Sequence, residues 1–179
     1  MAVMTATQQQ VEAVILWLLK LEDRSLSGAI RNLGDGAGLT RFGITSRYDS
    51  QFVPVDFWHA STADALREAA QFYQVRYWDK LRLSELNDLT LAAAILSAAV
   101  NDGTVTAVRL LQAAIGTSVD GGLGDRTLAA ANAKPDAQAL FTEAVVSRYY
   151  KIVQGNPSDE QFLQGWLSRA RAVYPNLPS

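Results

Sequence analysis

The sequence predicts a mainly α-helical fold with at most one short β-hairpin, and two observations carry this prediction. Six or seven segments show apolar residues at helical spacing between Gly, Pro or Asn signals, and no unit is repeated. Residues 89–100, Leu-Thr-Leu-Ala-Ala-Ala-Ile-Leu-Ser-Ala-Ala-Val, contain neither Gly nor Pro. At 12 residues this segment is too short to span a membrane, so it predicts a buried central helix in a single domain of 179 residues.

The other helices are predicted from capping and breaking signals. Thr7-Gln8-Gln9-Gln10 fits a capping box, Ser61 or Thr62 can cap a second helix, and Gly116 closes another. Pro135 and Pro157 interrupt the chain before later helices. The expected helices are 8–22, 62–81, 89–100, 104–115, a short one after 127, 136–153 and 158–173.

The first of these helices presents a carboxyl group on its apolar face. Val11, Ile15 and Leu18 share one face, and Glu22 is the next position on it, four residues beyond Leu18. Burial and the negative end of the helix dipole both disfavour a charged carboxylate there. A carboxylic acid that stays protonated near neutral pH suits general acid catalysis of glycosidic cleavage. The alternative is a solvated glutamate at a frayed helix end.

A glycine-rich stretch follows Glu22 and contains further polar residues. Gly34, Gly36, Gly38 and Gly43 fall within ten positions, together with Asp35 and Thr40. Glycine permits positive φ and close backbone approach, although a plain turn region is the alternative interpretation. The stretch ends in a run that could form a short strand. A loop and hairpin after a helix that bears a carboxylate would suit one wall of a sugar-binding cleft.

These residues resemble a known family. Glu22 followed by Asp35-Gly-Ala-Gly-Leu-Thr-Arg-Phe-Gly-Ile-Thr45 is similar to the pattern Glu-Gly-Gly, then Asp-x-Gly-Gly-x-Thr-x-x-Gly-Ile-Thr, of glycoside hydrolase family 108. Its members are small lysozyme-like muramidases, found as phage endolysins and as secretion-associated murein hydrolases. The resemblance continues in the family's order along nearly the whole chain, at residues 76–79, 99–103, 111–112, 120–128 and 165–169.

The chain departs from the family pattern at four places. Asp23 and Arg24 stand where the family has two glycines, and the gap from Glu22 to Asp35 is about four residues longer than usual. Ser97 replaces an aspartate and Ser168 an asparagine. Because the first departures fall between the two carboxylates, Asp23 is a rival of Asp35 as the second catalytic carboxylate.

The resemblance implies a lysozyme-like helical domain over residues 1–179, in which about 98–179 resembles a peptidoglycan-binding region of the same family. It implies a muramidase that cleaves the β-1,4 bond between N-acetylmuramic acid and N-acetylglucosamine. Glu22 would be the general acid. Asp35 would activate water or stabilise the transition state, and Thr40 would orient the water.

Substrate contacts are expected from Gly43, Tyr73, Tyr77 and Asn101. The two tyrosines can stack on pyranose rings, and the alternative for them is packing in the core. Asn101 corresponds to an asparagine near the family's cleft, and the alternative is that it only caps the helix before Gly103.

Two other functions are compatible with this sequence. In a lytic transglycosylase, Glu22 would act alone, first as acid and then as base, and would leave an anhydro sugar. The fold could also serve as a non-catalytic murein-binding component of a phage or secretion machine.

The composition argues against several other classes of protein. The chain has no cysteine and a single histidine, His59, which rules out disulfides and cysteine-based or two-histidine zinc sites. The expected reaction needs no metal or cofactor. A formal net charge of −2 provides no electrostatic basis for binding nucleic acid, so the expected partner is the glycan strand of peptidoglycan.

The first ten residues predict a protein that is made in the cytoplasm without a signal peptide. They carry no Lys or Arg, and polar residues occupy positions 8–10 and 12, where a signal peptide has its apolar core. To act on the cell wall in the periplasm, the protein would need a holin pore, a secretion system or cell lysis. An immunity or inhibitor protein is a further possible partner.

Overall fold

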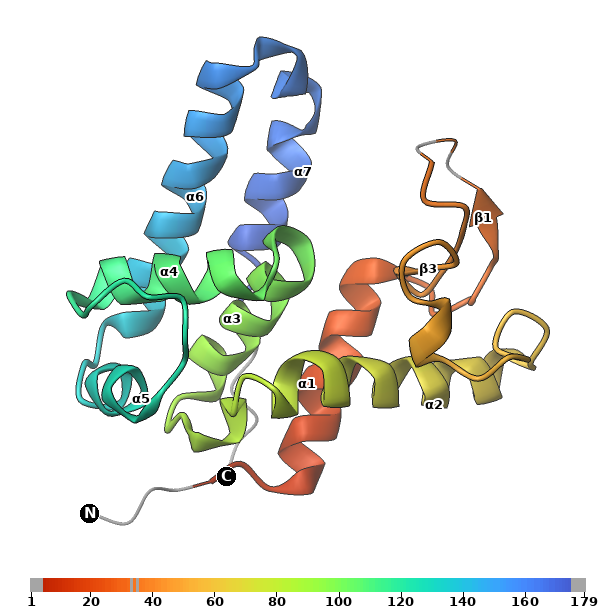
Figure 1. The fold of residues 1–179 in the computed structure, drawn as a ribbon, viewed down its shortest axis with the longest axis horizontal. Coiled ribbons are helices and arrows are strands. Elements are labelled where there is room, and N and C mark those ends of the chain that lie inside the picture. Colours follow the sequence, from red (N-terminus) through yellow and green to blue (C-terminus); the bar gives the residue numbers. More distant parts are fainter. Residues whose placement is uncertain (1–4, 33, 35, 175–179) are drawn as a thin grey trace. The chain divides into compact units, whose positions relative to one another are not determined.

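The computed structural model describes residues 5–32, 34 and 36–174 (Figure 1). Within this part of the chain, seven α-helices and one small antiparallel sheet confirm the predicted mainly α, lysozyme-like fold class. The described residues divide into an N-terminal unit within 8–76 and a C-terminal unit made of residues 77–174 together with residues 5–7. The expectation of a single domain stays a prediction, because two compact units can unfold together or separately.

The N-terminal unit is built on two packed helices. Helix α1 (Gln8–Glu22) begins and ends where the sequence predicts, and its expected apolar face is buried. Helix α2 (Thr62–Tyr73) packs against α1 and begins at Ser61, whose side chain accepts a hydrogen bond from the Asp64 N–H at 3.2 Å. It continues as a π-helical segment, η2 (Gln74–Asp79), whose last residues belong to the C-terminal unit.

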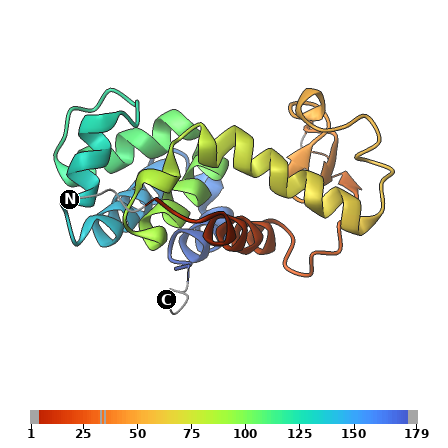
Figure 2. The ribbon, with the colours of Figure 1, turned by 90° about the horizontal axis from the view of Figure 1, so that it is seen from below.

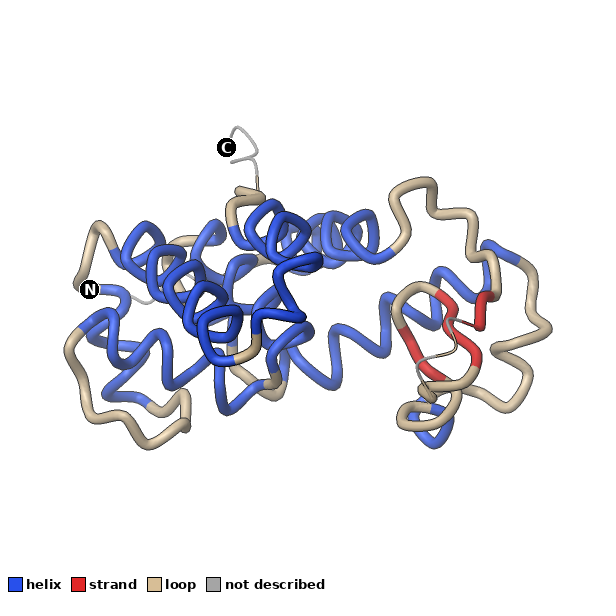
Figure 3. Tube along the Cα trace, turned by 90° about the horizontal axis from the view of Figure 1, so that it is seen from above, coloured by secondary structure: helices blue, strands red, loops and turns tan. Residues whose placement is uncertain are grey.

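A three-stranded sheet follows α1 in this unit. The order is β1 (Arg31–Asn32), β2 (Leu39–Arg41) and β3 (Ile44–Thr45), with both pairs antiparallel, and Figure 3 shows the strands side by side. The β2–β3 pair is the predicted hairpin. The pairing of β1 adds a strand that the sequence did not indicate, because two polar residues show no alternation of apolar and polar positions.

The long irregular stretch between α1 and α2 is held by the buried side chain of Arg41. Its Nε donates a hydrogen bond to the Gly28 carbonyl at 2.9 Å, Nη1 to the Phe57 carbonyl at 2.5 Å and Nη2 to the Ala60 carbonyl at 3.0 Å. Arg41 is only 5% exposed, and the ring of Phe57 lies 5.7 Å from its guanidinium carbon. One side chain thus ties the sheet to the segments on both sides of it.

The C-terminal unit surrounds the predicted central helix. Helix α3 (Leu89–Asp102) buries eight of its residues and packs against α4 (Thr104–Ile115), α6 (Ala137–Gly155) and α7 (Glu160–Ala170), as Figures 1 and 2 show. A short helix, α5 (Asp125–Asn132), joins α4 to α6. The remaining elements are the 3₁₀ turns η1 (Ser50–Phe52), η3 (Leu83–Glu85) and η4 (Pro157–Asp159).

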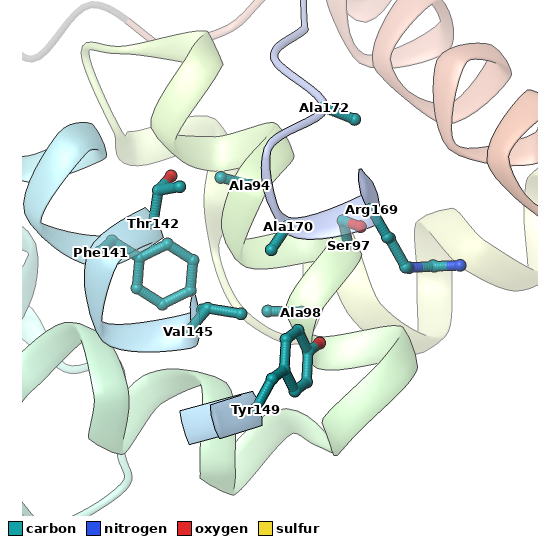
Figure 4. Close-up of a pocket in the computed structure, with 10 residues that line it drawn as sticks. All are labelled: Ala94, Ser97, Ala98, Phe141, Thr142, Val145, Tyr149, Arg169, Ala170 and Ala172. Atoms are coloured by element: carbon teal, nitrogen blue, oxygen red, sulfur yellow. The ribbon is translucent and has the colours of Figure 1, made fainter. Parts of the chain in front are cut away.

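A small cavity lies where α3, α6 and α7 meet (Figure 4). Ser97, Thr142, Tyr149 and Arg169 contribute polar groups to its otherwise apolar lining. Its volume of about 10 Å³ is enough for one water molecule at most, so it is no site for a sugar.

The loop before α5 is organised by one buried amide. Gln112 Nε2 donates hydrogen bonds to Asp120 Oδ1 at 2.7 Å and to the Gly122 carbonyl at 3.0 Å. Gln112 Oε1 accepts one from the Gly121 N–H at 2.8 Å. The hydrogen bond from Gln112 Nε2 is also the main cause of the lowered pKa of the Asp120 carboxyl group. The loop therefore has a structural function.

Among the described residues, no helix combines the length and the apolar character needed to cross a membrane.

We expect Arg41→Ala to lower the free energy of unfolding by about 3 kcal/mol, because three buried carbonyl groups lose their donors. Urea denaturation followed by circular dichroism measures this change. The matched control is Arg67→Ala, whose side chain is 74% exposed and should be nearly neutral. Equal effects of both substitutions would contradict the stabilising role of Arg41.

Candidate active site

The carboxylate of Glu22 lies against the turn between β2 and β3. Phe42 and Gly43 form this two-residue turn with φ values of +51° and +79°, and two positive φ values are the signature of a type I′ hairpin turn. A Cβ atom added to Gly43 would lie 2.6 Å from Glu22 Oε2 and 2.6 Å from the Tyr73 hydroxyl oxygen. Position 43 therefore requires glycine both for its φ and for this close approach.

Tyr73 supports the turn from within the unit. It is 1% exposed, and its hydroxyl donates a hydrogen bond to the Phe42 carbonyl at 2.9 Å. Phe42 is itself buried, with its ring over Gly28, so the strained positive φ of Phe42 is held from two sides. Tyr73 is thus placed behind Gly43 and the Glu22 carboxylate, where it positions the turn.

A pocket of about 190 Å³ opens in front of Glu22. Thr40 and Gly43, both predicted site residues, share this pocket with Glu22. Arg31 and Thr40 are directly paired across β1 and β2, so their side chains point to the same face of the sheet. The complete lining consists of Glu22, Asp23, Ala29, Arg31, Thr40, Phe42 and Gly43.

Arg31 is the pocket residue that sequence reasoning missed. It belongs to no motif, and only the pairing of β1 with β2 places its side chain beside Thr40. The glycine-rich stretch that follows it was a signal for a loop, but the register of a two-residue strand cannot be predicted from sequence. The Arg31 guanidinium provides the pocket with a cationic hydrogen-bond donor.

Asp35 lies outside the described residues, so its role stays a prediction. The residues on either side of it, Gly34 and Gly36, have φ values of +71° and +83°. The Gly36 carbonyl accepts a hydrogen bond from Arg47 Nη1 at 2.9 Å, which ties this loop to the segment after β3.

Asp23, the rival of Asp35 as second carboxylate, lines the same pocket as Glu22. The reason is that α1 ends at Glu22 and the chain folds back around the Asp23 carboxylate. Asp23 Oδ2 accepts hydrogen bonds from the Gly28 N–H at 2.8 Å and from Ser27 Oγ at 3.0 Å, and Oδ1 accepts two from Ser25. These bonds assign Asp23 a structural role at the base of the pocket.

The pKa of Asp23 reflects the same contacts. Burial is the largest single influence and raises this pKa, but the hydrogen bonds from Gly28, Ser25 and Ser27 together outweigh burial and lower it below its ordinary value. Asp23 is therefore a fixed, ionised group at neutral pH.

Tyr77 and Asn101 belong to the C-terminal unit, and their substrate contacts stay predictions. Asn101 is exposed, and its Nδ2 donates a hydrogen bond to the Tyr149 hydroxyl at 2.9 Å. That hydroxyl donates to Asp102 Oδ2 at 2.8 Å, and Arg148 Nε contacts Asp102 Oδ1 at 3.2 Å. Burial, followed by the hydrogen bond and charge of Asp102, raises the pKa of Tyr149. Asn101 is thus part of a fixed polar network as well as of the helix end.

A row of aromatic rings lies beside this network. Trp166 packs between Tyr149 and Phe162, with ring centroids at 5.4 Å and 5.9 Å, and Phe162 is 50% exposed. Exposed aromatic faces next to a polar amide are a common arrangement for contacting sugars.

Comparisons with known proteins agree with this architecture. Residues 26–103 match the family described as Glycosyl hydrolase 108, and residues 106–171 match the one described as Predicted Peptidoglycan domain. The solved structure of Brucella abortus SagA is similar with a TM-score of 0.69 and 22% identity, over 92% of this chain and 91% of that one. At this identity the likeness shows the fold alone. No curated protein matches the chain.

Fold, pocket and matched regions define the class of protein as a lysozyme-like glycoside hydrolase that acts on peptidoglycan. Residues 26–103 match glycoside hydrolase family 108, which confirms the resemblance seen in the motifs of the chain. The matched segment begins at Leu26, four residues after Glu22, so the role of Glu22 is argued from its surroundings.

We expect Gly43→Ala to lower hydrolysis of peptidoglycan by roughly 100-fold, because the added methyl group displaces the Glu22 carboxylate and a shift of about 1 Å can cost that much. Turbidity loss of purified murein measures the rate. Gly116→Ala is the control, since Gly116 also has a positive φ of +77° but no neighbour within 4 Å of the added atom. Comparable losses in both variants would mean that backbone strain alone is responsible.

Asp23→Asn should destabilise the protein at neutral pH and lose this effect in acid. Because the pKa of Asp23 is lowered in the folded state, its charge stabilises the fold above the unfolded pKa of about 3.9. That contribution is lost as the pH falls through the lower folded pKa. Melting temperatures of both proteins should therefore differ near pH 7 and converge once the pH lies below the lowered pKa of Asp23 in the folded state. A difference that is the same at every pH would contradict a role for the charge.

Proposed function

We propose that the protein is a muramidase that cleaves the β-1,4 bond between N-acetylmuramic acid and N-acetylglucosamine, with Glu22 as general acid. The observation that carries this proposal is the place of Glu22. Its part-buried carboxylate ends α1 at a pocket that also contains Thr40 and a backbone turn built around Gly43. Sugar-binding pockets of this class need one proton donor held in a fixed position beside the scissile bond.

The cleavage itself requires two groups. Glu22 donates its proton to the leaving glycosidic oxygen, which departs as a hydroxyl group. Asp35 removes a proton from the attacking water, whose oxygen forms the new bond to the anomeric carbon. The Thr40 hydroxyl orients that water, and Arg31 donates hydrogen bonds to acidic or polar substituents of the sugar in the same pocket. For an inverting reaction the two carboxyl groups stand roughly 6.5–9.5 Å apart.

The C-terminal unit would bind the glycan. The match of residues 106–171 supports peptidoglycan as its ligand. Asn101 and the half-exposed ring of Phe162 beside Trp166 present the polar and aromatic groups that such binding needs.

The protein would act on the cell wall in the periplasm, as an endolysin released through a holin or as a bacteriolytic effector of a secretion system. In the second case an immunity or inhibitor protein would protect the producing cell. The match of residues 106–171 to a peptidoglycan domain supports the cell wall as the place of action.

Glu22→Gln is expected to keep the fold and to lower clearing of permeabilised Gram-negative cells by roughly 100-fold or more, because the general acid is removed. Asp35→Asn should cost far more activity than Asp23→Asn, with Thr40→Ala in between. Circular dichroism verifies that each variant is folded. An unchanged rate in Glu22→Gln would contradict the assignment.

Mass spectrometry of digested murein separates the alternatives. Reducing ends formed by water addition support hydrolysis, and anhydro ends would identify a lytic transglycosylase. A wild-type protein that binds murein but releases no fragments would be a non-catalytic binding component.

A further inference from the structure

We propose that a groove on the N-terminal unit binds the stem peptide of peptidoglycan. The groove has a volume of about 420 Å³ and lies between η1 with the residues just after it and the end of α2 with the start of η2. Phe52, Val53 and Pro54 form one wall, and Glu68, Phe72 and Arg76 form the other. This volume is large enough for a short peptide.

The groove contains one acidic and one basic side chain that do not pair with each other. Among the described residues, neither Glu68 nor Arg76 forms an ion pair, and Glu68 Oε2 and Arg76 Nε are buried without a hydrogen-bond partner. Glu68 in α2 and Arg76 in η2 are eight positions apart, or about two helical turns. Within the described part of the chain, neither charge is therefore neutralised by another side chain of the protein.

The rings of Phe52 and Phe72 hold the guanidinium of Arg76 in place. The guanidinium carbon of Arg76 lies 3.3 Å from the ring centroid of Phe52 and 5.9 Å from that of Phe72. This cation–π contact orients the planar guanidinium, and an oriented guanidinium suits a carboxylate that accepts two hydrogen bonds side by side.

These groups select a ligand with both charges. A ligand that carries one amine and one carboxylate would place opposite charges beside Glu68 and Arg76, which have no ion-pair partner among the described residues. Rotation about the broad terminal torsion of Glu68 presents either oxygen to an amine in the groove. Phe52 and Val75, 40% and 57% exposed, offer apolar surface at the rim. A murein stem peptide has these features, since it carries alanine methyl groups and a diamino acid with a free amine and a free carboxylate.

The groove adjoins the candidate active site through one helix. Phe72 packs edge to face on Tyr73, with ring centroids 5.1 Å apart, and Tyr73 supports the turn at Gly43 beside Glu22. Helix α2 thus lines the groove through Phe72 and supports the turn of the active-site pocket through Tyr73. A glycan strand in that pocket has its stem peptide on every second sugar, within reach of such a neighbouring surface. The inference rests on the proposed function, because peptide and glycan belong to one substrate.

The test compares glycan strands that carry stem peptides with the same strands after an amidase has removed them. Glu68→Gln and Arg76→Lys should each lower kcat/KM roughly 10-fold or more on the first substrate, because a charge-assisted or bidentate contact is lost, and should leave the second unchanged. Arg67→Gln is the control on the same helix, where the side chain is 74% exposed, and should change neither rate. Equal effects on both substrates would overturn the inference.

A binding measurement separates this inference from the proposed function. Calorimetry with the tetrapeptide L-Ala-γ-D-Glu-meso-diaminopimelate-D-Ala uses the folded Glu22→Gln protein, so it does not depend on catalysis. Binding that is weakened roughly 10-fold by adding Glu68→Gln or Arg76→Lys supports the groove, even if the wild-type protein hydrolyses no glycan. No binding, or binding that neither substitution weakens, would overturn the inference while leaving the muramidase proposal intact.

Discussion

The close approach of the Gly43 backbone to the Glu22 carboxylate is the contact on which the rest of the N-terminal unit depends. An α-helix that ends in a carboxylate positions that group only along its own axis. The β2–β3 turn holds the Glu22 carboxylate from the side, and it can come this close because residue 43 has no Cβ. Tyr73 meets the same turn from α2, so helix, turn and second helix are joined at one point.

The side chains of Arg41 and Asp23 hold the irregular segments around this contact in place. Arg41 binds three backbone carbonyls that are distant from it in the sequence, and Asp23 accepts four hydrogen bonds from the five residues that follow it. Both groups are charged and part of an otherwise irregular region. Such regions have few regular backbone hydrogen bonds, so charge-assisted bonds from side chains to the backbone substitute for them.

A chain with a net charge of −2 cannot adhere to acidic murein by bulk attraction, and its recognition must come from individual groups. The structure offers three kinds of such groups. Arg31 lies in the active-site pocket, Glu68 and Arg76 lie in the groove beside it, and an aromatic row with an amide lies on the C-terminal unit. Glycan and peptide would thus be recognised by different surfaces.

The sequence by itself determined the helices, the family and the first catalytic candidate. Apolar spacing places residues 89–100 at the centre, and Glu22 continues the buried face of α1, because helical periodicity is a local property. The sequence indicated Gly43 as a site residue, but it did not show that the turn at Gly43 must approach Glu22 closely. Only the tertiary structure decided that Arg31 faces the pocket beside Thr40, that Asp23 caps a turn, and that Glu68 and Arg76 share a groove with Phe52. These relations depend on strand register and on contacts between distant segments, which no local pattern encodes.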